Sequence, residues 1–415
     1  MISVGLLLTA APTVAQQQQP RAITLGEALE LFTANNLELR LARAEAAEAA
    51  ALARQAAAYP NPSVIASHEP LSDGNRSYAE TYLNLSQRFE WPRTRSARQD
   101  AAARIAAAAA ARLSADSARL AFEVKRAYTD AARAGRVEGV LTRVTEVFRA
   151  GERSAEARYA AGDISLYDRR RIAVERARYE TRLAEAVLDA AAARRQLALL
   201  VAPTAAELQL APADSFAGFP PVIEPEQALE LALTRRGEVA AAEAAVGSAR
   251  ATASVARRER IPDLTATGGY KTQSDGFTGA FLGLSLPLPV WDRRAGAVDA
   301  ADARVVAAES RLSLTRRQVE NDVRRALDTY ESLSLRAELL GATATDEAAD
   351  LLDIARIAYA EGEMELIDLL DAAEALWEVR TAEARLRANL WTGYYDVERA
   401  VGGFTPGTNE TENDV

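Results

Sequence analysis

The residue types that carry most protein chemistry are scarce in this chain of 415 residues. It contains one histidine, His68, no cysteine, two methionines and no phosphate-binding loop of the Walker type. A lone imidazole with scattered carboxylates would bind a metal ion weakly and without specificity. The sequence assigns no nucleophile or acid as a partner of His68. We therefore predict that the chain is not an enzyme and has no catalytic residues, no metal site and no cofactor.

The composition favours long helices and argues against nucleic acid as a partner. Alanine dominates, aromatic residues make up 6% and charged residues 26%, with both signs interspersed. A net charge of −10 argues against nucleic acid, because phosphate binding needs clustered lysine and arginine. No apolar run reaches the roughly 18 residues that a membrane-spanning helix requires. Any membrane crossing must therefore use strands.

The second half of the chain repeats the first half. Residues 227–231 (QALEL) echo residues 27–31 (EALEL), and Trp291-Asp-Arg293 echoes Trp91-Pro-Arg93. Residues 359–368 (YAEGEMELID) echo residues 159–168 (YAAGDISLYD) in the same register. We predict a first repeat at 16–200, a linker at 201–224, a second repeat at 225–402 and a disordered tail at 403–415.

Proline placement indicates where helices can run, because a proline inside a helix costs on the order of 3 kcal/mol. Residues 93–202 and 290–405 contain none. Gly162 and Gly362 are the plausible turns within these tracts. Apolar residues that step by three and four indicate coiled-coil packing. The predicted helices are 93–160 and 292–360, with shorter ones at 24–58, 165–200, 226–260 and 366–400.

Each repeat also contains a segment that alternates like a β-hairpin, at 63–91 and at 263–288. Alternation over about ten residues is typical of transmembrane strands, and aromatic residues gather at the boundary of water and lipid. The alternative is that they form the core of a soluble hairpin. The predicted membrane-interface aromatics are Trp91, Trp291, Tyr78, Tyr82, Phe277 and Phe281.

Four strands cannot close into a barrel, and an open sheet edge cannot sit in lipid because its backbone groups would lack partners. Three copies would pool twelve strands, which lies within the range of closed membrane barrels. If the hairpins span a membrane, a homotrimer is therefore expected. The alternative is an isolated antiparallel coiled coil that encloses nothing.

The first residues are apolar and end in Thr13-Val-Ala15, which is typical of a secretory signal peptide cleaved before Gln16. The usual positively charged start is missing, so we predict a signal peptide at 1–15 that is truncated at its start. A frayed apolar terminus is the alternative. The prediction places the protein outside the cytoplasm.

The chain resembles the outer-membrane efflux protein (TolC-like) family over residues 22–403. The resemblance rests on Thr24-Leu-Gly-Glu-Ala-Leu-Glu-Leu31, on Asn35-Asn-Leu-Glu-Leu39 and on the duplicated plan. Phe89-Glu-Trp-Pro-Arg93 and Leu284-Ser-Leu-Pro-Leu-Pro-Val-Trp-Asp292 resemble its heavy-metal cation efflux (CzcC-like) branch. The implied fold class is mainly α, a duplicated helix–β-hairpin–helix repeat whose long α-helical barrel and transmembrane β-barrel are completed by trimerisation.

The resemblance also implies partners. It predicts an outer-membrane channel that extends into the periplasm and joins a periplasmic adaptor (membrane fusion) protein and an inner-membrane transporter of the RND type. The turns around the two glycines would be the tips that dock on the adaptor. Some family members carry a basic residue two positions after the second glycine, where this chain has Met364. The predicted docking residues are Ala161, Gly162, Asp163, Ile164, Glu361, Gly362, Glu363 and Met364.

The family's constriction lies on the helix after the second tip and is lined by acidic residues, which correspond here to Asp368 and Asp371. Their spacing places both on one helical face, so a trimer would hold two stacked carboxylate rings, a cation-selective gate. Ordinary solvated helix charge is the alternative.

Three functions remain open from the sequence. The first is a passive exit duct for divalent heavy-metal cations. The second is an outer-membrane factor for multidrug efflux or type I protein secretion. The third, from another class, is a soluble periplasmic coiled-coil scaffold.

Overall fold

The computed structural model describes residues 21–72, 74–202, 210–213, 220, 228–340 and 343–403. The chain divides into two compact units, each of which draws on both repeats. The first unit comprises residues 1–36, 123–220 and 332–392, and the second comprises 37–122, 221–331 and 393–415. The signal peptide predicted at 1–15, most of the linker and the tail beyond Gly403 lie outside the described residues.

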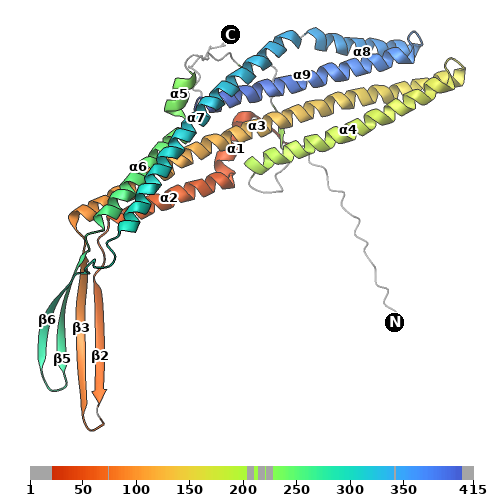
Figure 1. Ribbon diagram of the computed structural model, residues 1–415. Helices are drawn as coiled ribbons and strands as arrows, with labels where there is room; N and C mark the ends of the chain where they lie inside the picture. Colours follow the sequence, from red (N-terminus) through yellow and green to blue (C-terminus); the bar gives the residue numbers. More distant parts are fainter. Residues whose placement is uncertain are drawn as a thin grey trace, which may run out of the picture. The chain divides into compact units, whose positions relative to one another are not determined.

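The order helix, hairpin, helix, turn, helix occurs twice along the chain (Figure 1). Among the described residues, no helix is long and apolar enough to span a membrane. The first repeat contains α1 (Leu25–Asn35), α2 (Leu37–Ala57), β2 (Ser63–Ser72), β3 (Ser77–Phe89), α3 (Pro92–Ala161) and α4 (Leu166–Val201). The second contains α5 (Ala228–Arg235), α6 (Gly237–Arg258), β5 (Leu264–Gln273), β6 (Thr278–Ser285), α7 (Ala295–Leu340), α8 (Thr343–Glu361) and α9 (Leu366–Ala400).

Three predicted helices are each divided in two. The helix predicted at 24–58 breaks at Asn36 and the one at 226–260 breaks at Arg236, the equivalent position in the second repeat. Both residues leave the helical conformation in nearly the same way, with ψ of 125°. The helix predicted at 292–360 consists of α7 and α8, and residues 341 and 342 between them lie outside the described residues.

The two breaks are stabilised by different side chains. In the first unit, the side-chain Nδ2 atoms of Asn35 and Asn36 donate hydrogen bonds to the carbonyls of Val201 and Leu200, at 3.2 and 3.0 Å. These carbonyls are at the end of α4, where intrahelical donors run out. In the second unit, the buried Arg236 binds Asp322 of α7 at 3.0 Å and Glu238 at 3.2 Å.

The first unit is built around the four helices of two hairpins. On α3, Leu141, Val144 and Phe148 are buried at steps of three and four, and the Phe148 ring stacks on Tyr179 of α4 with centroids 4.7 Å apart. The facing side of the core includes Leu352 of α8. Aromatic and aliphatic burial along one stripe is what holds long helices in water, because helix propensity alone is marginal.

A short parallel sheet in the first unit was not predicted. Strands β1 (Arg21–Ile23) and β4 (Leu210–Pro212) pair there, and the Tyr128 hydroxyl donates to the Ile23 carbonyl at 2.8 Å. The sequence places β4 inside the proline-rich linker, where three residues carry no recognisable alternation. Only the pairing across the chain reveals this element.

The second unit combines helical segments from both repeats, namely α2, α5, α6 and parts of α3, α7 and α9, with a four-stranded antiparallel sheet. Buried residues of α7, including Val319, Val323 and Tyr330, again step by three and four. The sheet order is β2-β3-β5-β6, so β3 and β5 join the hairpins of the two repeats and β2 and β6 form the edges (Figure 1). In the pairing of β3 with β5, Leu83 lies opposite Tyr270.

The two hairpin turns of the first unit require glycine. Gly162 and Gly362 have φ of +88° and +83°, in the left-handed region that costs other residues roughly 1–2 kcal/mol. We expect Gly162→Ala to loosen this turn, so that amide hydrogen exchange across residues 158–168 becomes about ten-fold faster. Gly135→Ala is the control, because it lies within α3 and an added Cβ meets nothing within 4 Å. Unchanged exchange in Gly162→Ala would contradict the requirement.

Candidate functional site

The first tip, between α3 and α4, is a tight turn closed by backbone hydrogen bonds. The amide of Gly162 donates to the Tyr159 carbonyl at 3.1 Å, and the amide of Asp163 donates to the Arg158 carbonyl at 2.9 Å. Ser165 and Asp168 then form a capping box at the start of α4. The structure thus keeps residues 161–163 exposed at a hairpin end, while the Ile164 side chain packs against the core.

The second tip, between α8 and α9, has the same construction. The amide of Gly362 donates to the Tyr359 carbonyl at 3.3 Å and the amide of Glu363 donates to the Ala358 carbonyl at 2.9 Å. Residues 361–363 are exposed, and Met364 packs against the core as Ile164 does. Six of the eight predicted docking residues are therefore accessible, and two support the turns from inside.

Arg158 connects the two tips and was not predicted. Its guanidinium donates to the Tyr359 carbonyl at 3.0 Å and lies over the Tyr359 ring, 5.3 Å from the centroid. The Tyr359 ring is 1% exposed, and burial raises the pKa of its hydroxyl. A cation from the first hairpin thus reaches the second hairpin. It does so although this chain has Met364 at the position where some family members carry a basic residue. The repeated Tyr at 159 and 359 was the only sequence signal.

The two predicted gate residues have different surroundings. Asp368 and Asp371 are both exposed on the first turns of α9. Asp368 accepts a hydrogen bond from the Glu365 amide at 3.1 Å, which caps the helix as Asp168 caps α4. Asp371 makes no hydrogen bond or ion pair with any described residue, and its counterpart in the first repeat is Arg171. Asp371 is therefore the carboxylate without a local structural role.

The predicted membrane-interface aromatics do not all share one face of the sheet. On β3, the Tyr78 and Tyr82 hydroxyls donate to the Glu80 carboxylate. Lys271 and Gln273 of β5 bind the same carboxylate, at 2.8 and 2.7 Å. The register places Phe281 on this polar face too, opposite Gly269.

The other face of the sheet is apolar and exposed. Leu83 and Leu85 of β3 are 57% and 54% exposed, and Leu282 and Leu284 of β6 are 86% and 70% exposed. The sheet is thus amphipathic, with a hydrogen-bonded polar face and an uncovered apolar face.

The remaining three aromatics lie at the ends of the sheet. Phe277 is in the loop between β5 and β6 and is 70% exposed. Trp91 and Trp291 lie at the opposite end, where the strands join the helices. The Trp91 indole donates to the Pro262 carbonyl at 2.9 Å, whereas Trp291 is 95% exposed. These positions bracket the sheet at both ends.

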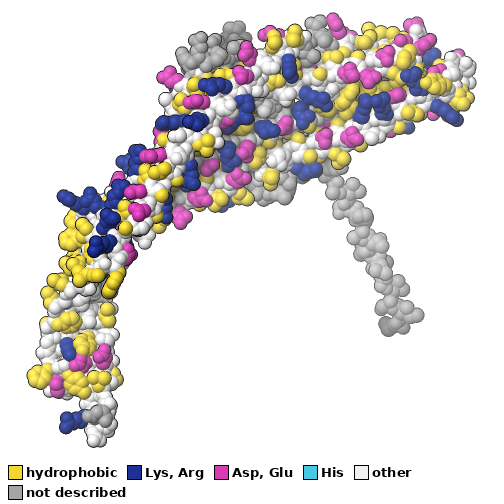
Figure 2. Space-filling view, viewed as in Figure 1, with side chains coloured by type: hydrophobic (Ala, Val, Ile, Leu, Met, Phe, Trp, Pro, Cys, Tyr) yellow, Lys and Arg dark blue, Asp and Glu magenta, His cyan; other side chains and the backbone are white. Residues whose placement is uncertain are grey.

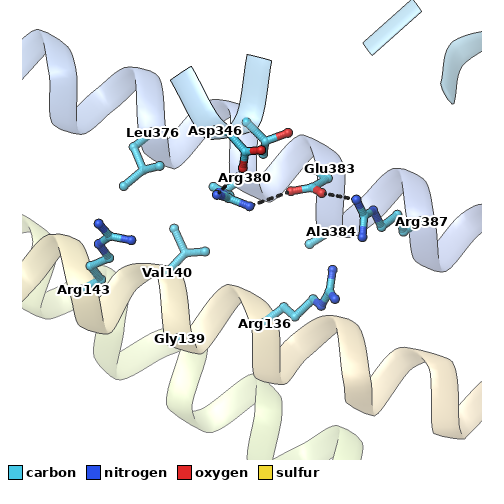
Figure 3. Close-up of a pocket in the computed structure, with 11 residues that line it drawn as sticks. Arg136, Gly139, Val140, Arg143, Asp346, Leu376, Arg380, Glu383, Ala384 and Arg387 are labelled. Atoms are coloured by element: carbon cyan, nitrogen blue, oxygen red, sulfur yellow. Dashed lines mark hydrogen bonds and ion pairs between the residues drawn. The ribbon is translucent and has the colours of Figure 1, made fainter. Parts of the chain in front are cut away.

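A charged cavity of about 500 Å³ lies between α3 and the helices α8 and α9 in the first unit (Figure 3). Glu383 pairs with Arg387 at 2.6 Å and with Arg380 at 3.4 Å, and Arg380 also pairs with Asp346 at 3.5 Å. Burial, and then the charge of Arg387, lower the pKa of Arg136. The lining contains no histidine, so the cavity is an ion-pair network and not a nucleophile with its base.

The described residues offer no metal cage. No group of three or more His, Asp or Glu residues in the described ranges could hold an ion. The Nδ1 atom of His68 lies 2.9 Å from the Thr81 hydroxyl on the exposed side of β2 and β3. The first unit therefore offers a pair of exposed tips with a nearby carboxylate, and the second unit offers an amphipathic sheet.

Comparison with known proteins agrees with this geometry. The model of the family described as Outer membrane efflux protein matches residues 228–403. The chain is 26% identical over 384 residues to the cobalt-zinc-cadmium resistance protein CzcC of Cupriavidus metallidurans, which covers 92% of this chain and 90% of that protein.

Solved channel structures share the fold. The CmeC outer membrane channel of Campylobacter jejuni superposes with a TM-score of 0.75 at 18% identity, over 97% of this chain and 94% of that one. The open state of the MtrE outer membrane channel of Neisseria gonorrhoeae gives 0.71 at 19% identity, over 97% and 98%.

These matches confirm the predicted resemblance and the mainly α, duplicated fold class. The efflux family model matches residues 228–403, and the likeness to CzcC supports the heavy-metal branch. A family of efflux proteins is not one of enzymes, so the matches also support the prediction that the chain is not an enzyme.

Ion pairs fasten α3 to α4 in the first unit. Glu180 accepts from Arg149 at 3.0 Å and from Arg176 at 2.8 Å, and Arg176 also binds Glu152 at 2.7 Å. The hydrogen bond from Arg149, with that from Arg176, lowers the pKa of Glu180 from its ordinary 4.5. The folded state therefore binds fewer protons than the unfolded state. The stability gained is present above pH 4.5 and is lost as the pH falls through the lowered pKa.

We expect Glu180→Gln to lower the melting temperature at pH 7, because it removes the ionised partner of two arginines. The same variant should show a flatter decline of melting temperature below pH 4.5 than the parent protein. Thermal unfolding followed by circular dichroism between pH 3 and pH 7 measures the melting temperature at pH 7 and its decline at lower pH. Glu156→Gln, on the exposed side of α3, should leave the profile unchanged. Parallel profiles for the parent and Glu180→Gln would contradict the assignment.

Proposed function

We propose that this chain, whose second repeat belongs to the outer membrane efflux protein family, forms a trimeric channel in the outer membrane that extends into the periplasm. It would act as a passive duct and complete a tripartite pump with a periplasmic adaptor protein and an inner-membrane transporter of the RND type. The preferred cargo is divalent heavy-metal cations. Cargo here is a substrate in transit and not a resident metal.

The observation that carries this proposal is the amphipathic sheet with two open edges. Its apolar face exposes Leu282 at 86% and Leu284 at 70%, which is costly in water and favourable in lipid. Strands β2 and β6 each have one neighbour in the described structure, so their outer backbone groups need partners before the sheet can enter a bilayer. Pairing of β6 with β2 of the next copy would supply them and turn the polar face inward.

The hairpin tips support the assignment of the adaptor as a partner. Residues 161–163 and 361–363 are exposed at the ends of rigid, capped turns, and Arg158 holds the two turns together. A pair of fixed, exposed turns is a surface on which a periplasmic helical hairpin can dock. The same six residues are our proposed contact surface.

The preference for metal cations rests on two features. One is the likeness to CzcC, whose name refers to cobalt, zinc and cadmium resistance. The other is the exposed carboxylate pair Asp368 and Asp371 on α9, which three-fold symmetry would repeat as rings that favour cations. The alternative cargo, drugs or a secreted protein, uses the same architecture and predicts no dependence on these carboxylates.

A soluble periplasmic scaffold is the alternative from another class. A scaffold of this kind explains the ion-paired helices, but it does not explain why the leucines of the sheet are exposed. We therefore rank it below the channel.

The oligomeric state provides the first test. We expect the full-length protein to fractionate with the outer membrane and to show the mass of a trimer in mild detergent. Leu282→Arg should reduce membrane assembly, because a charge on the lipid face of a strand costs roughly 2–4 kcal/mol near the bilayer centre. The control is Thr267→Arg on the polar face, opposite Gly283. A monodisperse monomer that needs no detergent would overturn the proposal.

The gate provides the second test, with Asp371 preferred over Asp368 because its side chain does not cap a helix. We expect Asp371→Asn to lower the ratio of cation to anion permeability of single channels in planar bilayers, since each trimer loses three carboxylates at one level. Asp350→Asn, on the exposed side of α8, is the matched control. An unchanged ratio for Asp371→Asn would refute the gate, even if the channel itself is confirmed.

A further inference from the structure

Arginine gathers where the helices of the second unit meet the sheet. Residues 88–98, 257–263 and 286–294 contain nine arginines, no lysine and four carboxylates, in a chain whose net charge is −10. Figure 2 shows these dark blue side chains grouped at the helical end beside the sheet, next to yellow hydrophobic side chains. We call this region the arginine rim. Its members are Arg88, Arg93, Arg95, Arg98, Arg257, Arg258, Arg260, Arg293 and Arg294.

Local carboxylates and aromatic rings account for only part of the rim. Glu90 pairs with Arg88 and Arg98, and Glu259 pairs with Arg294. Two more arginines of the rim have partners outside it. Arg257 binds Asp302 at 2.6 Å, and Arg95 stacks on the Tyr59 ring, 3.9 Å from its centroid.

Four members of the rim are exposed and have no ion pair with any described residue. They are Arg93, Arg258, Arg260 and Arg293. Of the four carboxylates in the rim, Glu90, Glu259 and Asp263 are already paired with Arg88, Arg98 and Arg294, and Asp292 accepts a hydrogen bond from the Arg294 amide, so positive charge remains in excess. The arrangement therefore favours an anion from outside the chain.

Exposed apolar side chains lie directly beside these arginines. Trp291, Leu288 and Val290 are 95%, 72% and 59% exposed, and they come from the segment between β6 and α7. A cavity of about 560 Å³ has Arg260 and Arg293 in its lining together with Leu288 and Trp291. Its lining also contains the rim's other paired residues, Arg88, Arg98, Arg294, Glu90, Glu259, Asp263 and Asp292. A ligand for this surface must combine a negative group with an apolar body.

We propose that the arginine rim binds anionic phospholipid, with the lipid phosphate on Arg258, Arg260 and Arg293 and the acyl chains along Leu288 and Trp291. Guanidinium groups match phosphate oxygens with two parallel hydrogen bonds, and an indole favours the boundary of headgroup and acyl chain. This inference rests on the proposed function, because it needs the sheet to lie in a bilayer.

A second copy of the chain fits the rim less well. Copies that share one barrel under three-fold symmetry would bring their rims to the same level, so each neighbour adds arginine beside arginine. A free phosphate ion would meet the charge but leave the exposed Trp291 and Leu288 uncovered. Lipid satisfies both requirements.

The test is native mass spectrometry of the full-length protein in detergent, after incubation with phosphatidylglycerol or with phosphatidylcholine. We expect the parent protein to retain phosphatidylglycerol preferentially. Arg258→Gln with Arg260→Gln and Arg293→Gln should reduce the retained fraction by about ten-fold, since each basic residue near an anionic surface contributes measurably. The charge-matched control replaces three exposed arginines of α7, Arg311→Gln, Arg317→Gln and Arg324→Gln, and should retain the lipid.

The outcomes separate the possible occupants. Equal retention by the rim variant and the parent overturns the inference, as does equal retention of the two lipids. Complete displacement of phosphatidylglycerol by inorganic phosphate would show a plain anion site and overturn the lipid assignment. Loss of the trimer in the rim variant, with unchanged lipid per chain, would identify a contact between copies and also overturn it.

The same spectra report on the proposed function independently. A trimer without lipid preference refutes only the rim, whereas a protein that is monomeric in every condition refutes the channel. If the triple variant fails to fold, Arg293→Lys with Arg260→Lys provides a second comparison. Lysine keeps the charge and loses the paired hydrogen bonds, so we expect this double variant to retain less phosphatidylglycerol than the parent. Retention equal to that of the parent would overturn the assignment.

Discussion

Backbone hydrogen bonding at the edges of the sheet determines under which conditions this sheet can enter a lipid bilayer. Every strand presents donors and acceptors on both sides, and water satisfies those of an edge strand only while the edge stays in water. Here β2 and β6 are edges, while the apolar face beside them exposes Leu83, Leu282 and Leu284. The apolar face is more stable in lipid than in water, whereas the unpaired backbone groups of the edges are costly in lipid. Entry into a bilayer and pairing between copies must therefore occur together.

The long helices must remain folded in water, and helix propensity alone does not stabilise them enough. Burial along one stripe, seen at Leu141, Val144 and Phe148, supplies the stability that propensity lacks. Surface ion pairs such as Glu180 with Arg149 add pH dependence more than bulk stability. Where each helix pair turns back, glycine at positive φ allows a short reversal that leaves residues 161–163 and 361–363 exposed. Each helix pair thus ends in a short turn whose residues are open to a partner.

Duplication explains why equivalent positions keep their geometry while their chemistry diverges. Asn36 and Arg236 break their helices with the same ψ of 125°, yet one binds helix-end carbonyls and the other binds carboxylates. Asp168 and Asp368 both cap a helix, whereas Arg171 and Asp371 carry opposite charges. Backbone constraints are shared by the repeats, whereas the side chains at equivalent positions differ in charge, both in buried positions and on the surface. The residues that differ are accordingly the better candidates for a specific role.

The sequence by itself determined the repeat, the two hairpins, the turns at Gly162 and Gly362 and the mainly α class, because each depends on local periodicity or on one residue type. Tertiary structure alone decided the helix breaks, the pairing of β1 with β4, the Arg158 bridge and the face on which Tyr78 and Tyr82 lie. These depend on partners that are distant in the chain, such as Tyr359 for Arg158 and Lys271 for Glu80. Local sequence carries no record of which distant group will meet a side chain, so only the folded arrangement could supply them.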